Sequence, residues 1–256
     1  MGDLARQKFV CIGIDFSINS PAAVALNPDG SVKQCMFINQ TKKFMKKSYE
    51  NILPFYRQPR ITQTKKRDGE DSDAFRHRRN TCMANTIMEW VDHISASTAQ
   101  CLVAMEGFAT GTTNARYLDI AEAAGYVKHG LSWGHTCLLL RIHDPLTVKK
   151  WATGTAHAMK YHMRESCPFA VPDELFTKGT AFKFPLSLDN GERLTHDLAG
   201  PGADIVDAYF LAQMMYYELN VRSGKTKLEY LADYQIEIFN RVTKSFPESI
   251  LSRSFV

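Results

Sequence analysis

The stretch Phe9-Val-Cys-Ile-Gly-Ile-Asp15 decides the fold, because it is a short apolar run that ends in an acid. Two further apolar runs cover residues 22–26 and 32–38, and the turn signals Asn19-Ser-Pro21 and Asn27-Pro-Asp-Gly30 separate the three runs. The pattern predicts three consecutive antiparallel strands joined as a β-meander.

Downstream of residue 72 the apolar period changes to three- and four-residue steps, which indicates a long amphipathic helix reaching about residue 98. Apolar runs predict strands at 101–106 and 136–142. Helices are expected at 112–128, 147–165, 203–219 and 225–243, and residues 167–200 are expected to form a loop with little regular structure. The sequence therefore predicts an α/β fold, a mixed five-stranded sheet flanked by helices.

The chain has 256 residues, enough for one large domain or one domain with an appendage, and its composition is ordinary for a globular protein. The six cysteines are scattered without a Cys-x-x-Cys pair, which favours buried thiols over disulfides or a zinc site. The sequence shows neither a signal peptide nor a run of eighteen apolar residues. We expect an intracellular, reducing compartment, such as the cytoplasm, and no membrane partner.

Positive charge is concentrated in one segment, although the net charge is only +4. Residues 41–80 contain twelve Lys or Arg against five acids. This concentration favours a polyanionic partner, and a solvated basic loop is the alternative.

Four carboxylates are the candidate site. Asp15 and Glu106 end predicted buried strands, where a carboxylate is costly to desolvate unless a positive charge lies against it. Asp204 and Asp207 are three residues apart and would share one face of a helix. Four converging carboxylates repel one another, and two hard divalent cations such as Mg²⁺ or Mn²⁺ would remove that repulsion. Each acid has an ordinary alternative: Asp204 and Asp207 as acids favoured at a helix N-terminus, Asp15 as a turn cap, and Glu106 as the partner of a lysine.

These motifs resemble the RuvC-type Holliday junction resolvases. Ile12-Gly-Ile-Asp15 is similar to the opening strand of that family, Val103-Ala-Met-Glu106-Gly-Phe108 to its second acidic strand, and Pro201-Gly-Ala-Asp204-Ile-Val-Asp207 to the start of its C-terminal helix. The segment from Asp144 to Lys160 matches the family in its proline, its Val-Lys pair, its glycine, its alanine and its second lysine. The resemblance covers roughly residues 8–40 and 101–215. One departure is that Gly107 places Phe108 one residue earlier than the family's usual aromatic.

The resemblance implies an RNase H-like fold and a homodimer that makes paired nicks in four-way DNA junctions, leaving 5′-phosphate ends. It implies two Mg²⁺ ions per active site, with Mn²⁺ as a substitute, held by Asp15, Glu106, Asp204 and Asp207. Lys149 and Lys160 match family lysines that approach phosphate, with a solvated helix face as the alternative. Phe108 is a candidate for stacking on an unpaired base, with a core position as the alternative. We expect further phosphate contacts from Lys42, Lys43, Lys46 and Lys47.

The expected organisation is a nuclease domain over residues 1–222, with a basic insertion at about 40–72, and a C-terminal helical extension over 223–256. For the dimer interface we favour the helical stripe Met83, Ile87, Trp90 and Ile94, and for packing within the subunit the last helix; both stripes have core packing as an alternative. Ser223-Gly-Lys-Thr226 follows a helix instead of a strand, so no nucleotide cofactor is expected.

Two other functions compete with junction resolution. The same fold and metals would suit a broader nuclease of flaps and forks, an activity that the basic insertion favours. A DNA-binding module without catalysis is the third hypothesis, and the presence of all four acids argues against it. The additional segments would suit a viral or phage version of the family.

Overall fold

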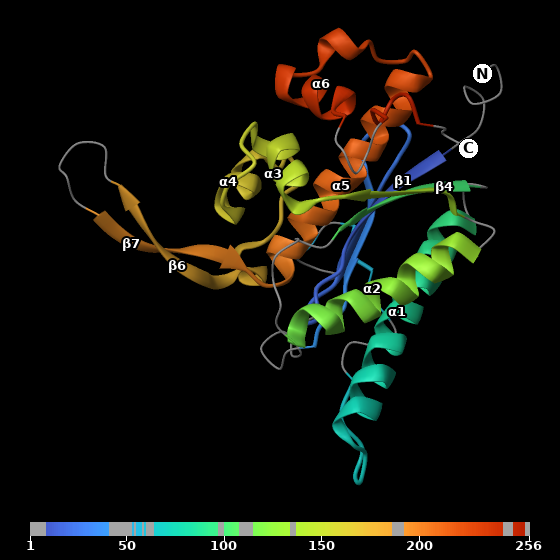
Figure 1. Cartoon of the computed structure of the whole chain (residues 1–256), viewed down its shortest axis with the longest axis vertical. Helices are drawn as coiled ribbons and strands as arrows, with labels where there is room; N and C mark the ends of the chain where they lie inside the picture. The colour runs from blue at the N-terminus through green and yellow to red at the C-terminus, as the bar shows by residue number, and fades with distance from the viewer. Residues whose placement is uncertain are drawn as a thin grey trace.

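The structure, a computed structural model, describes residues 9–40, 53, 55–57, 59, 64–96, 100–107, 115–133, 137–185, 192–242 and 248–253. Its centre is a five-stranded sheet with the order β3-β2-β1-β4-β5 (Figure 1). The strands are β1 (Phe9–Asp15), β2 (Ala22–Leu26), β3 (Val32–Phe37), β4 (Gln100–Glu106) and β5 (Cys137–His143). The first three strands pair antiparallel, and β4 and β5 extend the sheet in parallel with β1. This arrangement confirms the predicted RNase H-like mixed sheet.

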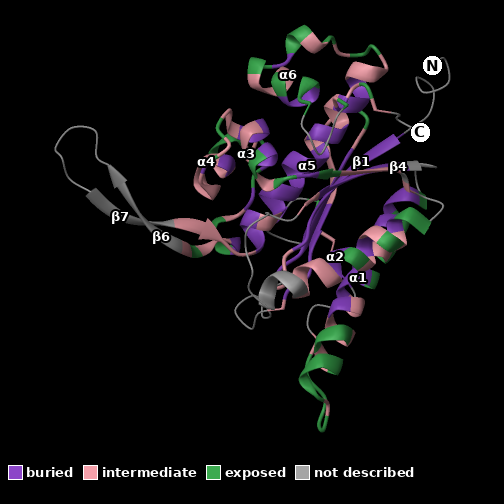
Figure 2. Cartoon of the chain, in the orientation of Figure 1, coloured by how far each residue is buried: buried purple, intermediate pink, exposed green. Residues whose placement is uncertain are grey.

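Helices cover both faces of the sheet. The helices α1 (Ser72–Ala96) and α2 (Ala115–Trp133) lie on one face, and α5 (Pro201–Arg222) lies on the other (Figure 1). Alternate residues of β1 face the two layers: Val10, Ile12 and Ile14 join the core under α1 and α2, and Phe9 and Cys11 join the core under α5. The strands β1, β2 and β4 are therefore buried on both sides of the sheet, as the colouring in Figure 2 shows. This double burial explains why these three strands are nearly continuous apolar runs.

Helix α5 approaches the sheet closely at Gly13. A Cβ atom at this position would lie 1.9 Å from the carbonyl oxygen of Ala208 and 2.4 Å from the backbone nitrogen of Ala212. The backbone of α5 therefore lies directly against β1, with no side chain between them. This contact places the first turns of α5 beside the carboxyl end of β1, where Asp15 lies.

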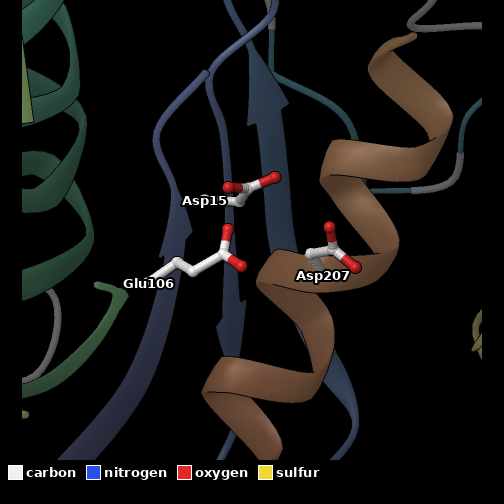
Figure 3. Close-up of side chains that lie close together, drawn as sticks. All are labelled: Asp15, Glu106 and Asp207. Atoms are coloured by element: carbon white, nitrogen blue, oxygen red, sulfur yellow. The ribbon is translucent and has the colours of Figure 1, made fainter. Parts of the chain in front are cut away.

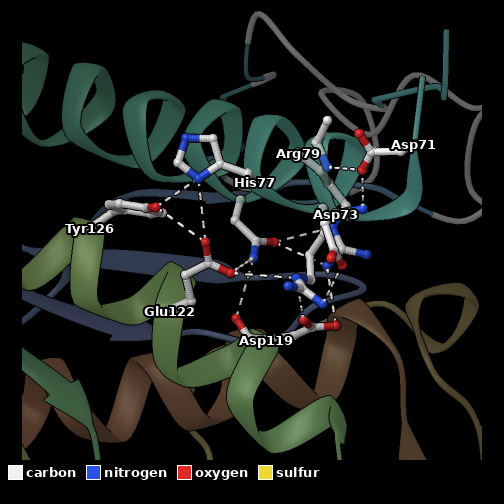
Figure 4. Close-up of polar contacts among 10 residues, drawn as sticks. Asp71, Asp73, His77, Arg79, Asp119, Glu122 and Tyr126 are labelled. Carbon is white, nitrogen blue, oxygen red and sulfur yellow. Dashed lines mark hydrogen bonds and ion pairs between the residues drawn. The ribbon is translucent and has the colours of Figure 1, made fainter. Parts of the chain in front are cut away.

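Helix α2 is joined to α1 by a polar network on their outer side (Figure 4). Arg76 Nε lies 3.1 Å from a carboxylate oxygen of Asp119, and the hydroxyl of Tyr126 donates to Glu122 at 3.2 Å. Asn80 Nδ2 also donates to Glu122, at 3.2 Å. Partly exposed ion pairs of this kind add little stability each, so the apolar contacts under the helices dominate the packing.

The stripe favoured for the dimer interface is part of the core. Met83, Ile87, Trp90 and Ile94 are at most 4% exposed and pack against the sheet with residues of β1 and β4. A stripe already covered by its own sheet has no surface left for a partner. The predicted use of this stripe in dimerisation is therefore wrong.

The predicted helix over 147–165 is two helices, α3 (Pro145–Thr153) and α4 (Lys160–Ser166). Gly154 adopts a left-handed conformation, with φ of 80°, and ends α3 by donating its N–H to the carbonyl of Lys150. Glycine is favoured at such a position because it has no Cβ. The break allows Lys149 of α3 and Lys160 of α4 to lie near one site. In one straight helix the two residues would be about 16 Å apart along the axis.

The predicted loop over 167–200 was also wrong. It contains a short 3₁₀ helix, Asp173–Leu175, and two antiparallel strands, β6 (Thr177–Pro185) and β7 (Glu192–Ala199). These strands form a ribbon that extends away from the main sheet (Figure 1). The antiparallel register runs from the pair Thr177 and Ala199 to the pair Pro185 and Glu192, so the segment pairs with itself although it contains prolines and glycines.

The predicted last helix over 225–243 is shorter than expected. The chain forms a 3₁₀ turn at Leu228–Tyr230 and the helix α6 (Asp233–Asn240), separated by extended backbone at Leu231 and Ala232. Leu231, Ile238 and Phe239 are buried in the same core as α5 and Trp151, so this segment packs on its own subunit. The division of the chain at residue 222 stays a prediction. Among the described residues, no helix has the length and apolar character needed to cross a membrane.

The contact at Gly13 gives a stability prediction. Gly13→Ala places a methyl group inside the backbone of α5, so we expect a loss of at least about 1–3 kcal/mol in the free energy of unfolding, the usual cost of overpacking. The matched control is Gly125→Ala in α2, where a Cβ would meet no atom within 4 Å. Replacing an exposed helical glycine by alanine stabilises by about 0.5–1 kcal/mol. Urea unfolding measures both, and equal effects of the two variants would contradict the account.

Candidate metal and active site

The parallel pairing of β1 with β4 brings the first two carboxylates together. The register pairs Ile14 with Met105, so Asp15 and Glu106 follow as neighbours at the same edge of the sheet. On the other side of β4, Gly107 extends the pairing with β5, since its N–H donates to the carbonyl of His143 at 2.6 Å. Asp15 itself pairs with Ala22 of β2, so the backbone of β1 and β4 is fixed up to the carboxylates that end them.

Helix α5 supplies the other two carboxylates. Gly200, with φ of 86°, and Pro201 at the first position start the helix, and Asp204 and Asp207 follow one turn apart. Carboxylate oxygens of Asp15, Glu106 and Asp207 all lie within 4.8 Å of one another. Figure 3 shows these three side chains converging from the two strand ends and the helix. We call Asp15, Glu106 and Asp207 the acidic triad.

Asp207 is the most buried member of the triad, with 2% of its surface exposed. Both of its carboxylate oxygens are buried, and neither accepts a hydrogen bond of normal geometry from the described residues. Its charge is balanced by an ion pair with Lys160, the first residue of α4. The Lys160 ammonium faces Oδ2, so Oδ1 is the Asp207 oxygen that has no partner among the described residues and is available as a ligand. Three converging carboxylates suit a hard divalent cation. The residues of the triad therefore fit Mg²⁺ or Mn²⁺.

Asp204 has different partners. Its Oδ2 atom accepts a hydrogen bond from the Ser17 hydroxyl at 2.9 Å and another from the Ser20 hydroxyl. Burial raises the pKa of Asp204, while the two hydroxyl donors and the charge of Lys160 oppose that rise. The sequence reasoning identified Asp204 but missed both serines. The available signal was their position, since they lie in the short polar segment that directly follows Asp15.

Asp15 is buried next to two other carboxylates. Burial is the main reason that its pKa lies well above the ordinary aspartate value, and the charges of Glu106 and Asp204 raise it further. The positive charge of Lys160 only partly opposes this rise. Without a cation, the site therefore favours a protonated Asp15.

The two predicted phosphate-binding lysines both lie near the acidic triad. Asp144 caps α3 by accepting the N–H of Thr147 at 2.9 Å, and this helix carries Lys149. Burial lowers the pKa of Lys149, and Lys160 lowers it further, while the carboxylates of Asp197 and Glu106 oppose the shift. Because α4 turns back after Gly154, the positive charges of both lysines act at the same site.

Five other predicted DNA-binding residues lie outside the described part of the chain. They are Phe108 and the four lysines of the basic segment, Lys42, Lys43, Lys46 and Lys47. Their predicted roles stay predictions.

The chain is similar in structure to Thermus thermophilus RuvC, with 13% identity and a TM-score of 0.44 over 84% of this chain and 96% of that chain. A second structure of T. thermophilus RuvC, in complex with a Holliday junction substrate, gives 11% identity and a TM-score of 0.44 over the same shares. The chain is similar to RuvC-type resolvases. The yeast mitochondrial Holliday junction resolvase Ydc2 gives 13% identity and a TM-score of 0.41 over 83% of this chain and 80% of that chain.

The sequence matches no protein-family model and no curated protein.

The electrostatics of Asp15 predict an unusual pH dependence in the absence of divalent cations. A carboxyl group whose pKa is raised on folding stabilises the protein below its unfolded pKa of about 4, and this contribution is lost as the pH rises toward the folded value. In EDTA at neutral pH, we therefore expect Asp15→Asn to be more stable than the wild type, with the difference vanishing at acidic pH.

Thermal unfolding across this pH range measures the effect, and Asp29→Asn is the matched control. Asp29 is exposed, and its pKa is lowered by hydrogen bonds from the hydroxyl and backbone N–H of Ser31, so the control should not gain stability at neutral pH. Mg²⁺ should stabilise the wild type more than Asp15→Asn. If the unfolding temperatures of the wild type and Asp15→Asn change with pH in parallel, the ionised Asp15 carboxylate does not destabilise the fold.

Proposed function

We propose that this protein is a divalent-metal-dependent endonuclease that resolves four-way DNA junctions by paired nicks. One observation carries the proposal: carboxylate oxygens from two strand ends and one helix lie within 4.8 Å of one another, and the most buried carboxylate, Asp207, has one oxygen without a partner among the described residues. A protein has little reason to bear this repulsion unless a cation is to be bound. The nuclease hypothesis also suits the fold.

Each part of the site has a role in this proposal. Asp15, Glu106 and Asp207 would hold one divalent cation. Asp204 would be a ligand of a second divalent cation. Bound cations of this kind activate water and stabilise the leaving 3′ oxygen during phosphodiester hydrolysis, which leaves 5′-phosphate ends. Lys149 would orient the scissile phosphate, and Lys160 would balance the triad's charge until DNA and metal bind.

Binding of branched DNA would involve residues beyond the site. The basic segment with Lys42, Lys43, Lys46 and Lys47 would contact phosphates along the duplex arms, where charge neutralisation dominates affinity. Phe108 would stack on an unpaired base at the branch point, because every base presents a π-face. Paired nicks would require two active sites related by a two-fold axis, so we propose a homodimer, with an interface other than the buried stripe of α1.

A cleavage assay tests the proposal against its two alternatives. Purified protein is incubated with Mg²⁺ and a four-way junction, a 5′ flap or a linear duplex. We expect paired nicks that can be ligated in the junction, and little cutting of the other two. Equal cutting of flaps would favour the broader branched-DNA nuclease, and binding without any cutting would favour the inactive module.

The site assignment predicts the behaviour of two variants in this assay. Asp204→Asn and Asp207→Asn each remove a carboxylate charge from the site, so we expect cleavage to fall by more than about a hundredfold. Junction binding should stay unchanged or become tighter, because repulsion toward phosphate is relieved. The matched control is Asp119→Asn on α2, which removes a carboxylate paired with Arg76 outside the acidic cluster. Substantial Mg²⁺-dependent cleavage by both site variants would mean that the active site lies elsewhere.

A further inference from the structure

Asp204 and Asp207 differ in their surroundings although they lie one turn apart on the same helix. Asp207 belongs to the acidic triad and pairs with Lys160. Asp204 lies outside the triad, and its Oδ2 atom accepts both serine hydroxyls, from residues 184 and 187 positions away in the sequence. Two neutral donors thus converge on one oxygen of one carboxylate.

The orientation of the Ser17 hydroxyl is fixed by a third hydrogen bond. The backbone N–H of Ser20 donates to the Ser17 hydroxyl oxygen at 3.0 Å. The Ser17 oxygen acts as acceptor in that bond, and its own proton is directed to Asp204. The Ser20 side chain is buried, at 4% exposure, which limits competition from water.

The segment that carries the serines is fixed to the sheet on both sides. The N–H of Gln40 donates to the carbonyl of Asn19 at 3.0 Å, and the N–H of Ile38 donates to the carbonyl of Pro21 at 2.9 Å. The segment between β1 and β2 is therefore anchored to the end of β3. Its hydroxyls are preorganised, so Asp204 meets donors whose positions are already set.

The second carboxylate oxygen of Asp204 has a different status. Both printed hydrogen bonds of Asp204 end on Oδ2, and no described residue donates to Oδ1. Asp204 lies one helical turn before Asp207 on α5, which places it beside the triad. Because Oδ2 is held by the serines, the carboxylate plane cannot rotate freely. One oxygen is used for positioning and the other remains available.

We propose that Ser17 and Ser20 are positioning residues that hold Asp204 through Oδ2 and thereby leave Oδ1 as a ligand for a second divalent cation beside the triad. This inference rests on the proposed metal-dependent function and assigns the serines a part in it. Both serine hydroxyls donate to Asp204, so in this role they act through that carboxylate.

The test is a Mn²⁺ titration of the full chain followed by calorimetry, without DNA. We expect two binding events in the wild type. In the variant carrying Ser17→Ala and Ser20→Ala, the event that depends on Asp204 should weaken by about tenfold or more, since hydrogen bonds to a charged group are worth that much. Asp204→Asn should weaken the same event, and adding the serine changes to Asp204→Asn should have little further effect.

Two further variants separate positioning from a loss of packing. Ser17→Thr keeps the hydroxyl and should retain both events. Ser95→Ala removes another buried hydroxyl, which donates to the carbonyl of Val91 within α1, and should also retain both events. If the double serine variant does not fold, Ser17→Ala alone should still weaken the second event, because Ser17 is only half-buried.

The outcomes distinguish this inference from the proposed function. Two wild-type-like Mn²⁺ events in a folded serine variant would overturn the inference, even if junctions are cut. Selective loss of the second event in the serine variants would support it, even if the wild type cuts no branched DNA and the proposed function fails.

Discussion

The direct contact between the backbone of α5 and β1 at Gly13 is the constraint on which the site depends. Any side chain at this position would separate the helix from the sheet, because the nearest backbone atoms of α5 lie 1.9 and 2.4 Å from the place of a Cβ. Asp15 is two residues further along β1, and Asp207 directly precedes Ala208, whose carbonyl faces Gly13. A small shift of α5 would therefore open the acidic triad. The apolar packing of the sheet fixes the distances between the carboxylates, and the carboxylates themselves oppose that packing.

The carboxylates of the site have different partners. Lys160 balances Asp207, and the hydroxyls of Ser17 and Ser20 bind Asp204. Asp15 has a raised pKa because it is buried beside Glu106 and Asp204. Clusters of carboxylates are costly in a stable fold, and their occurrence at one edge of a sheet is typical of a metal site. The same arrangement explains why a cation is expected to stabilise the folded protein as well as activate water.

The sequence was sufficient for the main sheet and for the convergence of Asp15, Glu106 and Asp207. The buried strands are continuous apolar runs, and acids at the ends of parallel strands meet at one edge. The β6–β7 ribbon was missed because Gly179 and Pro185 outweighed the alternation of Phe182, Lys183 and Phe184. The dipeptide Asn190-Gly191 between the two strands is a common hairpin signal and favours the ribbon. The break at Gly154 had its own signal, a glycine at the end of a helical pattern.

Other features could not be derived from local patterns. An amphipathic stripe such as that of α1 has the same sequence whether a sheet or a second subunit covers it. The contacts of Ser17 and Ser20 with Asp204 join residues more than 180 positions apart, so they depend on the complete fold. The most direct test of the central claim is an anomalous diffraction map of a crystal of the full chain soaked with Mn²⁺. The account predicts a peak at coordinating distance from the oxygens of Asp15, Glu106 and Asp207. A crystal that binds Mn²⁺ elsewhere and shows no peak between these three carboxylates would contradict it.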